Sequence, residues 1–173
     1  AAKRNHNWRI WCSAASTGEE PYSIAMTASE TLGAGGQFHI VNSDIDTKVL
    51  ATAARGVYKA DNVKGLSAER TQRFFMRGKG ANAGFIRVKP ELQKHMEFMA
   101  INLIQELPLR EAFDVVFCRN VMIYFDGPTQ RQVLERIHRV MKPGGTLFVG
   151  HAENFSDARS LFALRGKTVY ERV

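Results

Sequence analysis

Two acids that follow a run of small residues carry the first chemical signal in this sequence. The apolar stretch 8–14 leads into SAASTGEE, whose small side chains leave the main chain open to a ligand. Glu19 and Glu20 favour a ligand with a cationic part, whereas a phosphate site typically has a glycine-rich loop followed by lysine. The alternative is structural, because small residues allow close packing and acids complement the dipole at a helix start.

A second acidic segment ends the next apolar stretch, where residues 38–46 are FHIVNSDID. Asp44 lies some 20 residues or more beyond the first turn, at a position from which an acid can accept both hydroxyls of a ribose. Asp46 is better placed to cap the helix that follows. Both acids could serve as caps, but together with the open first turn Asp44 favours a nucleoside ligand.

Polar residues also follow two further apolar stretches. Arg119 and Asn120 come directly after FDVVFC, and Tyr124 follows closely enough to face the same cleft. Asn102 and Leu103 come after MEFMAI, where they would complete a wall around an adenine ring. Each of these residues also occurs commonly in surface turns, so a single one indicates little. Their common position, directly after an apolar strand, indicates a binding site.

The segments described above fall within an alternation of predicted strands and helices. Apolar runs predict strands at 8–14, 38–46, 96–102, 113–120 and 146–150, and a closing strand in KTVYERV. Helical patterns predict helices at 19–32, at 46–56 and from Pro128 to a stop at Pro143-Gly144-Gly145. This alternation predicts an α/β fold with a largely parallel sheet, in which ligands bind beyond the carboxyl ends of the strands.

Residues 73–92 interrupt the alternation. Two short strand-like runs flank a glycine-rich loop there, which predicts an inserted β-hairpin. Phe74, Phe75 and Met76 are either a dock for a peptide or, as is usual on a small hairpin, its own core.

Composition sets the broad class of the protein. The chain has 173 residues, 45% of them hydrophobic, which suits a single globular domain. No apolar run approaches the roughly 18 residues of a membrane span, and no secretory signal is recognisable, so we expect a cytoplasmic protein without membrane insertion. Cys12 and Cys118 are expected to be reduced thiols, and no Cys/His spacing suggests zinc or another metal.

The net charge of +7 favours binding of an anionic partner. A nucleic-acid methyltransferase is one hypothesis, but the basic residues are interpreted as dispersed, and no Asn-Pro-Pro-Tyr-like motif for a flipped base is present. Nucleic acid is therefore not expected as the partner.

The motifs together resemble the chemotaxis receptor methyltransferases, the CheR family, which use S-adenosylmethionine. The resemblance extends over nearly the whole chain and depends on order and spacing as well as on residue types. The matching segments are AASTGEEPYS, SDID, RFFMRG, INL, FDVVFCRNVMIYF, KPGG and GHAENF. The usual Gly-x-Gly-x-Gly of methyltransferases is absent, and SAASTGEE takes its place.

This resemblance implies a fold and a domain organisation. The fold would be the class I S-adenosylmethionine-dependent, Rossmann-like sheet of seven strands, the last one antiparallel. Residues 1–173 would form one methyltransferase domain, with a β-subdomain inserted at about 72–92. The small helical N-terminal domain of the family is not in this sequence, so we expect weakened cofactor binding and poor activity from this chain alone.

The resemblance also implies residue roles. One of Glu19 and Glu20 would hold the amino end of the cofactor, and Asp44 its ribose. The remaining cofactor-binding residues would be Asn102, Leu103, Arg119 and Asn120. Tyr124 and Arg119 are the candidate catalytic residues, which would orient the reactants without acting as acid or base. His151 is interpreted as a turn residue, because the chemistry needs no general base.

The implied reaction is methyl transfer to glutamate side chains of a chemotaxis receptor, giving glutamyl methyl esters and S-adenosylhomocysteine. The partner would be the cytoplasmic domain of the receptor, and its C-terminal tail peptide could add a strand to the hairpin at 73–90. The alternative is a catalytically weak or inactive domain that binds the cofactor and docks on receptors.

Overall fold

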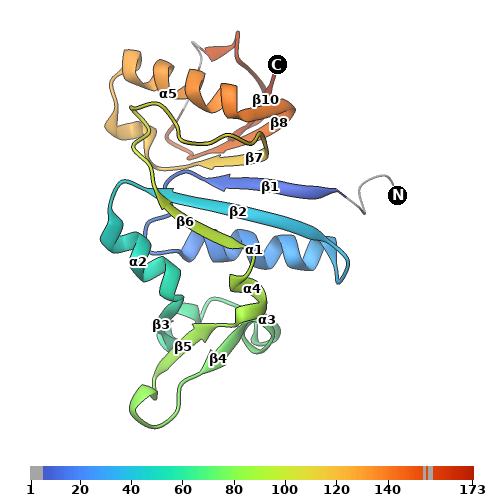
Figure 1. Cartoon of the computed structure of the whole chain (residues 1–173), viewed down its shortest axis with the longest axis vertical. Coiled ribbons are helices and arrows are strands. Elements are labelled where there is room, and N and C mark those ends of the chain that lie inside the picture. The colour runs from blue at the N-terminus through green and yellow to red at the C-terminus, as the bar shows by residue number, and fades with distance from the viewer. Residues whose placement is uncertain (1–5, 154, 156–157) are drawn as a thin grey trace.

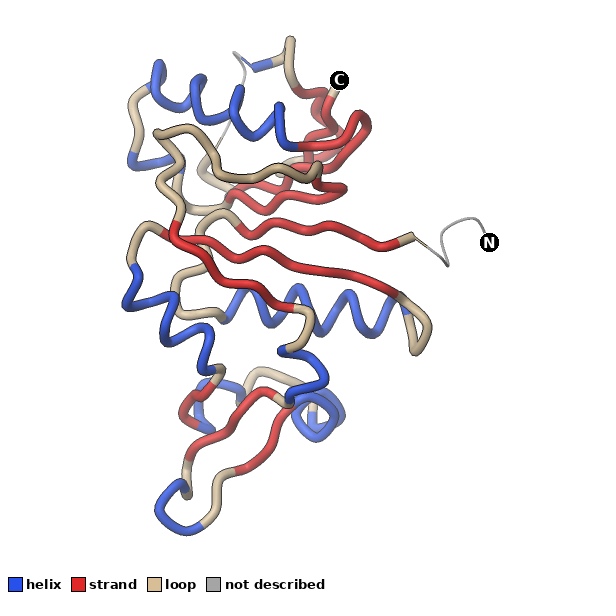
Figure 2. The backbone as a smooth tube through the Cα atoms, viewed as in Figure 1, coloured by secondary structure: helices blue, strands red, loops and turns tan. Residues whose placement is uncertain are grey.

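The computed structural model describes residues 6–153, 155 and 158–173 of the chain. Figures 1 and 2 show one large sheet with helices packed against it and a smaller sheet that projects from one end. The strands of the large sheet are β1 (Asn7–Cys12), β2 (Gln37–Asp44), β6 (Met96–Ala100), β7 (Phe113–Cys118), β8 (Met141–Val149), β9 (Phe162–Gly166) and β10 (Val169–Arg172).

The large sheet has the order β6-β2-β1-β7-β8-β10-β9. Neighbours from β6 to β8 pair in parallel, and β10 pairs antiparallel with both β8 and β9. The expected mostly parallel sheet of seven strands with an antiparallel last strand is confirmed. Because β1 lies between β2 and β7, the polar segments that follow these three strands meet at one edge.

The helices follow the caps and breakers of the sequence. They are α1 (Glu19–Leu32), α2 (Thr47–Arg55), α3 (Ala68–Phe74), α4 (Pro90–Gln93) and α5 (Gly127–Val140), with short 3₁₀ turns η1 (Ala60–Val63), η2 (Gly80–Asn82) and η3 (Met122–Tyr124). Asp46 caps α2 through its carboxylate, which accepts the backbone N–H of Lys48 at 2.8 Å, as its position predicts. None of the helices in the described part of the chain is long and apolar enough to cross a bilayer.

The core lies on both faces of the large sheet. Successive side chains of a strand point to opposite faces, so Trp11 packs in the cluster that contains α5, and Ile10 packs in the cluster that contains α1. Both side chains are at least nine-tenths buried. The central strand is therefore anchored from both sides, which fixes the position of the turn at its carboxyl end.

The smaller sheet consists of β3 (Val57–Lys59), β5 (Phe85–Val88) and β4 (Phe75–Arg77), in the order β3-β5-β4. The predicted hairpin is β4 and β5, which pair antiparallel. The third strand, β3, was not predicted, because three residues are too few to show an alternating pattern. Phe74 and Phe75 are buried and belong to the core cluster that also contains α1 and the large sheet, so they are not a core of the hairpin alone, whereas Met76 is exposed.

The carboxyl-terminal part differs from the prediction in two places. Pro143-Gly144-Gly145 was expected between a helix and a strand, but α5 ends at Val140 and these residues already belong to β8. The pairing of β8 with β7 shifts register in this region, which accommodates the proline. Strand β9 was missed because its residues, FALRG, are mostly half-exposed or exposed and lack a core-facing alternation.

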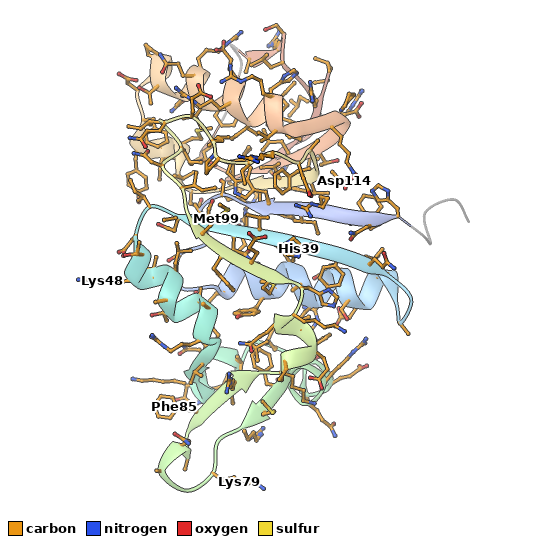
Figure 3. The ribbon with its side chains drawn as sticks, in the orientation of Figure 1. His39, Lys48, Lys79, Phe85, Met99 and Asp114 are labelled. Carbon is orange, nitrogen blue, oxygen red and sulfur yellow. The ribbon has the colours of Figure 1, made fainter. Side chains whose placement is uncertain are left out.

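Asp114 ties the amino ends of three strands together. Its carboxylate accepts the backbone N–H of Arg9 at 2.8 Å and hydrogen bonds from the Lys142 ammonium at 2.9 and 3.0 Å, and it also contacts His6. Burial by itself raises the pKa of the Asp114 carboxyl. The hydrogen bonds from Arg9, Lys142 and His6 lower that pKa by more than burial raises it, so the pKa lies below its ordinary value. Figure 3 shows Asp114 beside the strands at the end of the sheet near the amino terminus.

We predict that Asp114→Asn lowers the free energy of unfolding by about 1–2 kcal/mol at pH 7. Because the folded-state pKa is depressed, this contribution is present above the unfolded value of about 3.9 and disappears as the pH falls through the lower folded value. Urea unfolding at pH 7 and at pH 3 measures the difference. Asp61→Asn, at an exposed ion pair with Lys64, is the control and should change little. A loss at pH 3 as large as that at pH 7 would contradict the role of the ionised carboxylate.

Candidate functional site

A cavity of about 460 Å³ lies where the carboxyl ends of β1, β2 and β7 meet the segment after β6. We call it the polar cavity because the polar residues that follow these strands converge on it, although apolar residues contribute much of its wall. It is lined by Ser13, Ala14, Ser16, Asp44, Ile45, Ile101, Asn102, Leu103, Ile104, Arg119, Asn120, Val121, Tyr124 and Phe125. Four segments far apart in the sequence contribute to it. The parallel sheet brings them together, as the strand-end argument predicted.

The turn after β1 presents bare main chain to this cavity. Ala15 donates its N–H to the carbonyl oxygen of Ser43 at 2.8 Å, and Ser16 donates its N–H to Asp44 Oδ2 at 2.9 Å. Ser16 and Gly18 both have positive φ, 48° and 102°. The small residues thus let the turn fold tightly against the end of β2, and a ligand in the cavity meets backbone atoms.

Asp44 and Asn102 lie on the two sides of this cavity nearest β2 and β6. The Asp44 carboxylate accepts the N–H groups of Ser16 and Asp46, at 2.9 and 3.1 Å. Two oxygens offer about four acceptor positions, so capacity remains for hydroxyl groups of a ligand. Asn102 Oδ1 accepts the N–H of Ile104 at 3.1 Å, which fixes the amide and leaves its NH₂ group to donate.

Arg119 and Asn120 form the wall that follows β7. The Arg119 guanidinium donates to Glu20 Oε2 at 2.5 Å, so the two charges form an ion pair at the mouth of the cavity. Their side chains are 38% and 27% exposed, which leaves both accessible to a ligand. Asn120 has a φ of 59°, a left-handed conformation that is uncommon among non-glycine residues and is adopted most readily by asparagine and aspartate.

The structure separates the two adjacent acids. Glu20 turns toward Arg119, whereas Glu19 is exposed and accepts a hydrogen bond from the Thr17 hydroxyl at 2.6 Å. Neither acid is among the residues that line the polar cavity. Both acids lie in the first turn of α1, where they also complement the helix dipole. Of the two acids, Glu20 is the one connected to the polar cavity, through its contact with Arg119, which lines that cavity.

The two cysteines near the cavity are not nucleophiles. Burial, together with the nearby Glu20 carboxylate, raises the pKa of the Cys12 thiol well above its ordinary value. Burial likewise raises the pKa of Cys118 to about 12. Both thiols are uncharged at neutral pH, so thiolate chemistry is not supported here.

Exposed apolar side chains stand around the mouth of the cavity. Tyr124 is 79% exposed, Ile45 68% and Ile104 47%. Tyr124 was predicted to face the cleft, and it lines the rim. The isoleucines were not predicted, since a lone apolar residue in a turn gives no signal on its own. Exposed apolar side chains around the mouth of a cavity suit a macromolecular partner that covers the site.

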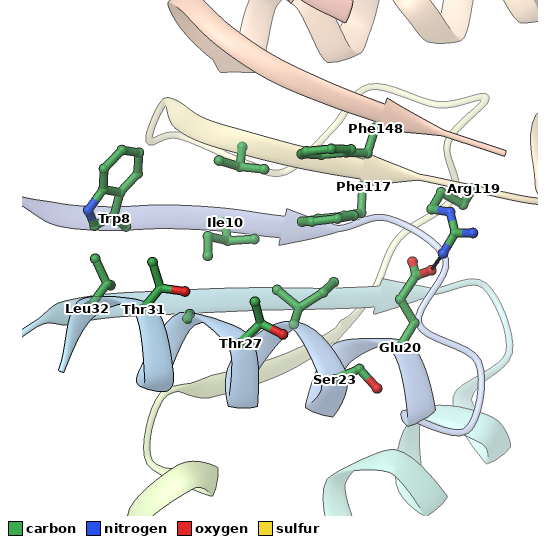
Figure 4. Close-up of a pocket in the computed structure, with 13 residues that line it drawn as sticks. Trp8, Ile10, Glu20, Ser23, Thr27, Thr31, Leu32, Phe117, Arg119 and Phe148 are labelled. Atoms are coloured by element: carbon green, nitrogen blue, oxygen red, sulfur yellow. Dashed lines mark hydrogen bonds and ion pairs between the residues drawn. The ribbon is translucent and has the colours of Figure 1, made fainter. Parts of the chain in front are cut away.

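A second cavity of about 590 Å³ lies beside α1 and has a different character (Figure 4). Its walls are mainly apolar, with the Phe117 and Phe148 rings stacked at 4.7 Å, and Trp8 and Leu32 at the end far from Glu20. The ion pair of Glu20 with Arg119 closes one end, and Arg119 lines both cavities. Threonine and serine hydroxyls are its other polar groups, so it offers little to a ribose, and the polar cavity is the better nucleoside site.

Sequence reasoning missed one buried acid, Glu153 in GHAENF. It is 6% exposed and accepts hydrogen bonds from the main chain next to Arg119. His151, in the same segment, is exposed in a turn, as predicted. No three His, Cys, Asp or Glu side chains are grouped as metal ligands would be within 6–153, 155 and 158–173.

Comparison with known proteins gives a family. Residues 1–170 match the family described as CheR methyltransferase, SAM binding domain. The chain is 49% identical over 172 residues to a chemotaxis protein methyltransferase of Escherichia coli (strain K12), covering 98% of this chain and 60% of that protein. It is also 49% identical to chemotaxis protein methyltransferase 2 of Pseudomonas aeruginosa, covering 97% of this chain and 61% of that protein. The chain therefore spans about 60% of the length of these relatives.

Solved structures support the fold. The glycopeptide N-methyltransferase MtfA complexed with S-adenosylmethionine matches with a TM-score of 0.52 and 13% identity, over 84% of this chain and 47% of that one. The [4+2]-cyclase SpnF matches with a TM-score of 0.52 and 18% identity, over 83% and 38%. At such low identity these likenesses concern the fold alone, and they agree with the predicted class I sheet.

We predict that Gly18→Ala destabilises the protein by about 3 kcal/mol. A Cβ at this position would lie 2.5 Å from the Tyr58 hydroxyl and 2.9 Å from Ala53 Cβ, and the φ of 102° adds strain. Gly33→Ala is the matched control, since its φ is also positive, at 71°, but a Cβ there meets open space. It should cost about 1–2 kcal/mol. Equal losses of unfolding free energy for the two variants would show that packing at the turn is unimportant.

Proposed function

Because the chain belongs to the CheR methyltransferase family, we propose that it binds S-adenosylmethionine in the polar cavity and methylates glutamate side chains of chemotaxis receptors. The products would be glutamyl methyl esters and S-adenosylhomocysteine. The observation that carries the proposal is the convergence of Asp44, Asn102, Arg119 and Asn120 around one hollow walled by bare main chain.

The residues of the cavity fit such a cofactor. Asp44 retains acceptor positions that suit the two ribose hydroxyls. Leu103 and Ile101, both about 95% buried, give an apolar wall for the adenine, and Asn102 supplies donors at its edge. Asn120 follows β7 on the opposite side of the hollow. The sugar and the base thus each meet groups of matching chemistry.

The amino-acid end of the cofactor is zwitterionic, and the cavity mouth holds a pair of opposite charges. We assign Glu20 to the cationic amino group, because Glu19 faces solvent and bonds to Thr17. Arg119 is at hydrogen-bonding distance from Glu20, so binding would divide this ion pair between the two ligand charges. The pairing in the free protein keeps both side chains near the positions they would then need.

The mechanism requires alignment of the reactants and little acid–base chemistry. The cofactor supplies a methyl group on a sulfonium sulfur, which is strongly electrophilic. The glutamate carboxylate that accepts it is already ionised at neutral pH. Good orientation alone can provide roughly 7–11 kcal/mol. The task of Arg119 is to orient the incoming carboxylate, and that of Tyr124 at the rim is to hold it against the cavity and exclude water.

The small sheet is the proposed dock for the receptor's C-terminal tail. Between residues 57 and 94 lie nine of the 24 Lys and Arg but only three of the 17 Asp and Glu, so most of the net charge of +7 resides there. The interpretation of the charge as dispersed was therefore wrong. A concentrated positive field favours an acidic segment of a partner.

The geometry of the small sheet also suits strand addition. Strands β3 and β4 each pair with β5 alone in the part of the chain that the structure describes, so their outer edges are available. One face carries Val57, Arg87 and Met76 in a row, next to the exposed Phe85. Figure 3 shows the Phe85 side chain on the outside of this sheet. Apolar and basic side chains thus alternate beside a free edge.

We predict that Asp44→Asn weakens S-adenosylhomocysteine binding by about 1–3 kcal/mol, because a neutral amide loses the charge-assisted hydrogen bonds to the ribose. Isothermal titration calorimetry measures the affinity. Asp46→Asn is the matched control two residues away, where asparagine still caps α2, and the affinity should be unchanged. Equal affinities for the wild type and Asp44→Asn would remove Asp44 from the site.

We further predict that the chain transfers a labelled methyl group from S-adenosylmethionine to receptors in membranes, in a form that alkali releases as expected for an ester. Tyr124→Ala should lower the rate at least about tenfold, which corresponds to about 1.4 kcal/mol of the barrier, without changing the affinity for S-adenosylhomocysteine. Ile123→Ala is the control, since Ile123 is an exposed neighbour that does not line the cavity. Saturable cofactor binding without any transfer would favour the inactive docking alternative.

A further inference from the structure

Glu153 is a buried acid outside the set of residues assigned to the site. It follows β8 in the loop that begins at Gly150, and only 6% of its surface is exposed. No salt bridge of Glu153 occurs among the described residues, so its charge is balanced by hydrogen bonds. A buried carboxylate is costly unless it is well hydrogen-bonded, which raises the question of what it stabilises.

Its two oxygens accept four main-chain N–H groups. Oε1 accepts from Val121 at 3.1 Å and from Met122 at 2.8 Å, and Oε2 accepts from Asn120 at 3.2 Å and from Gly150 at 2.5 Å. Hydrogen bonds to an ionised acceptor are roughly twice as strong as neutral ones. The carboxylate therefore holds the main chain directly after Arg119 and joins it to the end of β8.

The turn that it holds has an unusual main-chain conformation and lies at the site. Asn120 has a φ of 59°, a left-handed conformation that is uncommon outside glycine and that asparagine adopts more readily than most residues. In this conformation the three consecutive N–H groups of residues 120–122 point at one carboxylate. The other side of the turn is fixed as well, since Gln130 Nε2 donates to the carbonyl oxygens of Met122 and Phe125 at 2.9 and 3.0 Å.

The end of β8 approaches the turn at Asn120 so closely that position 150 requires a glycine. A Cβ there would lie 2.7 Å from Asn120 Oδ1 and 2.8 Å from Glu153 Oε2. Gly150, Glu153 and Asn120 thus fit together without space for another atom. This packing is a second observation, independent of the hydrogen bonds, that the end of β8 sets the position of Asn120.

We infer that Glu153 is a positioning residue: its carboxylate fixes the main chain of 120–122 in the shape that places Arg119 and Asn120 in the wall of the polar cavity. This inference rests on the proposed function, because it assigns Glu153 a part in cofactor binding. Glu153 does not line the cavity itself, so it acts through the turn alone.

The test compares Glu153→Gln with the wild-type chain. Glutamine keeps the size of the side chain but replaces one acceptor oxygen by a donor NH₂ group that faces main-chain N–H groups. We expect at least about tenfold weaker binding of S-adenosylhomocysteine by calorimetry and at least about tenfold faster hydrogen exchange of the amides of 120–122. The amides of β1 and β2 should keep their protection.

Asp114→Asn is the matched control, because Asp114 also accepts a main-chain N–H but lies at the opposite end of β7. It should lower stability and leave the affinity unchanged. If Glu153→Gln does not fold, Gln130→Ala loosens the same turn from its other side, and it should also weaken binding and speed exchange at 120–122.

Wild-type affinity and wild-type exchange in the folded Glu153→Gln variant, or in Gln130→Ala if only that one folds, would overturn the inference. Faster exchange at 120–122 with unchanged affinity would also overturn it, since the turn would then not matter for binding. A wild-type chain that binds no S-adenosylhomocysteine would instead contradict the proposed function. Unchanged hydrogen exchange in the Glu153→Gln variant would separately show that Glu153 does not stabilise the turn.

Discussion

The parallel pairing of β1 with β2 on one side and β7 on the other is the constraint on which the site depends. Each of these strands is followed by a polar turn, and the pairing brings the three turns to one edge of the sheet. Trp11 and Ile10 anchor β1 in the cores of both faces, so the turn after it has little freedom. The cavity is therefore a result of strand order, which brings together residues that lie far apart in the sequence.

Carboxylates that accept main-chain N–H groups recur throughout the molecule. Asp44 holds the turn after β1, Asp46 and Asp126 cap helices, Asp114 joins the amino ends of three strands, and Glu153 holds the turn after β7. A carboxylate can accept several such bonds at once, and these bonds are stronger than those between neutral groups. The protein thus shapes its cleft with short acidic side chains placed where the chain turns, and Asp44 serves both the fold and the proposed ligand.

Positive charge and binding chemistry occupy different parts of the chain. The segment 57–94, which contains the small sheet, carries most of the excess of Lys and Arg, whereas Arg119 beside the cavity pairs with Glu20. A field of one sign attracts and orients an acidic partner over several ångströms, while a neutral ion pair at the mouth can exchange partners with a zwitterionic ligand. Long-range attraction and local recognition are in this way separated.

The sequence by itself determined the elements whose residues show a period or a cap. The strands predicted at 38–46 and 113–120, which correspond to β2 and β7, the helix 19–32, the Asp46 cap and the family all followed from local patterns. It did not predict β3 or β9, which are short and lack alternation, nor the entry of Pro143 into β8, which a register shift against β7 allows. Only the tertiary structure separated Glu20 from Glu19 and brought Glu153 to the turn at Asn120, because both depend on which side chains meet across distant strands. Local patterns fix where the chain turns, but the long-range pairing of strands decides what each turn faces.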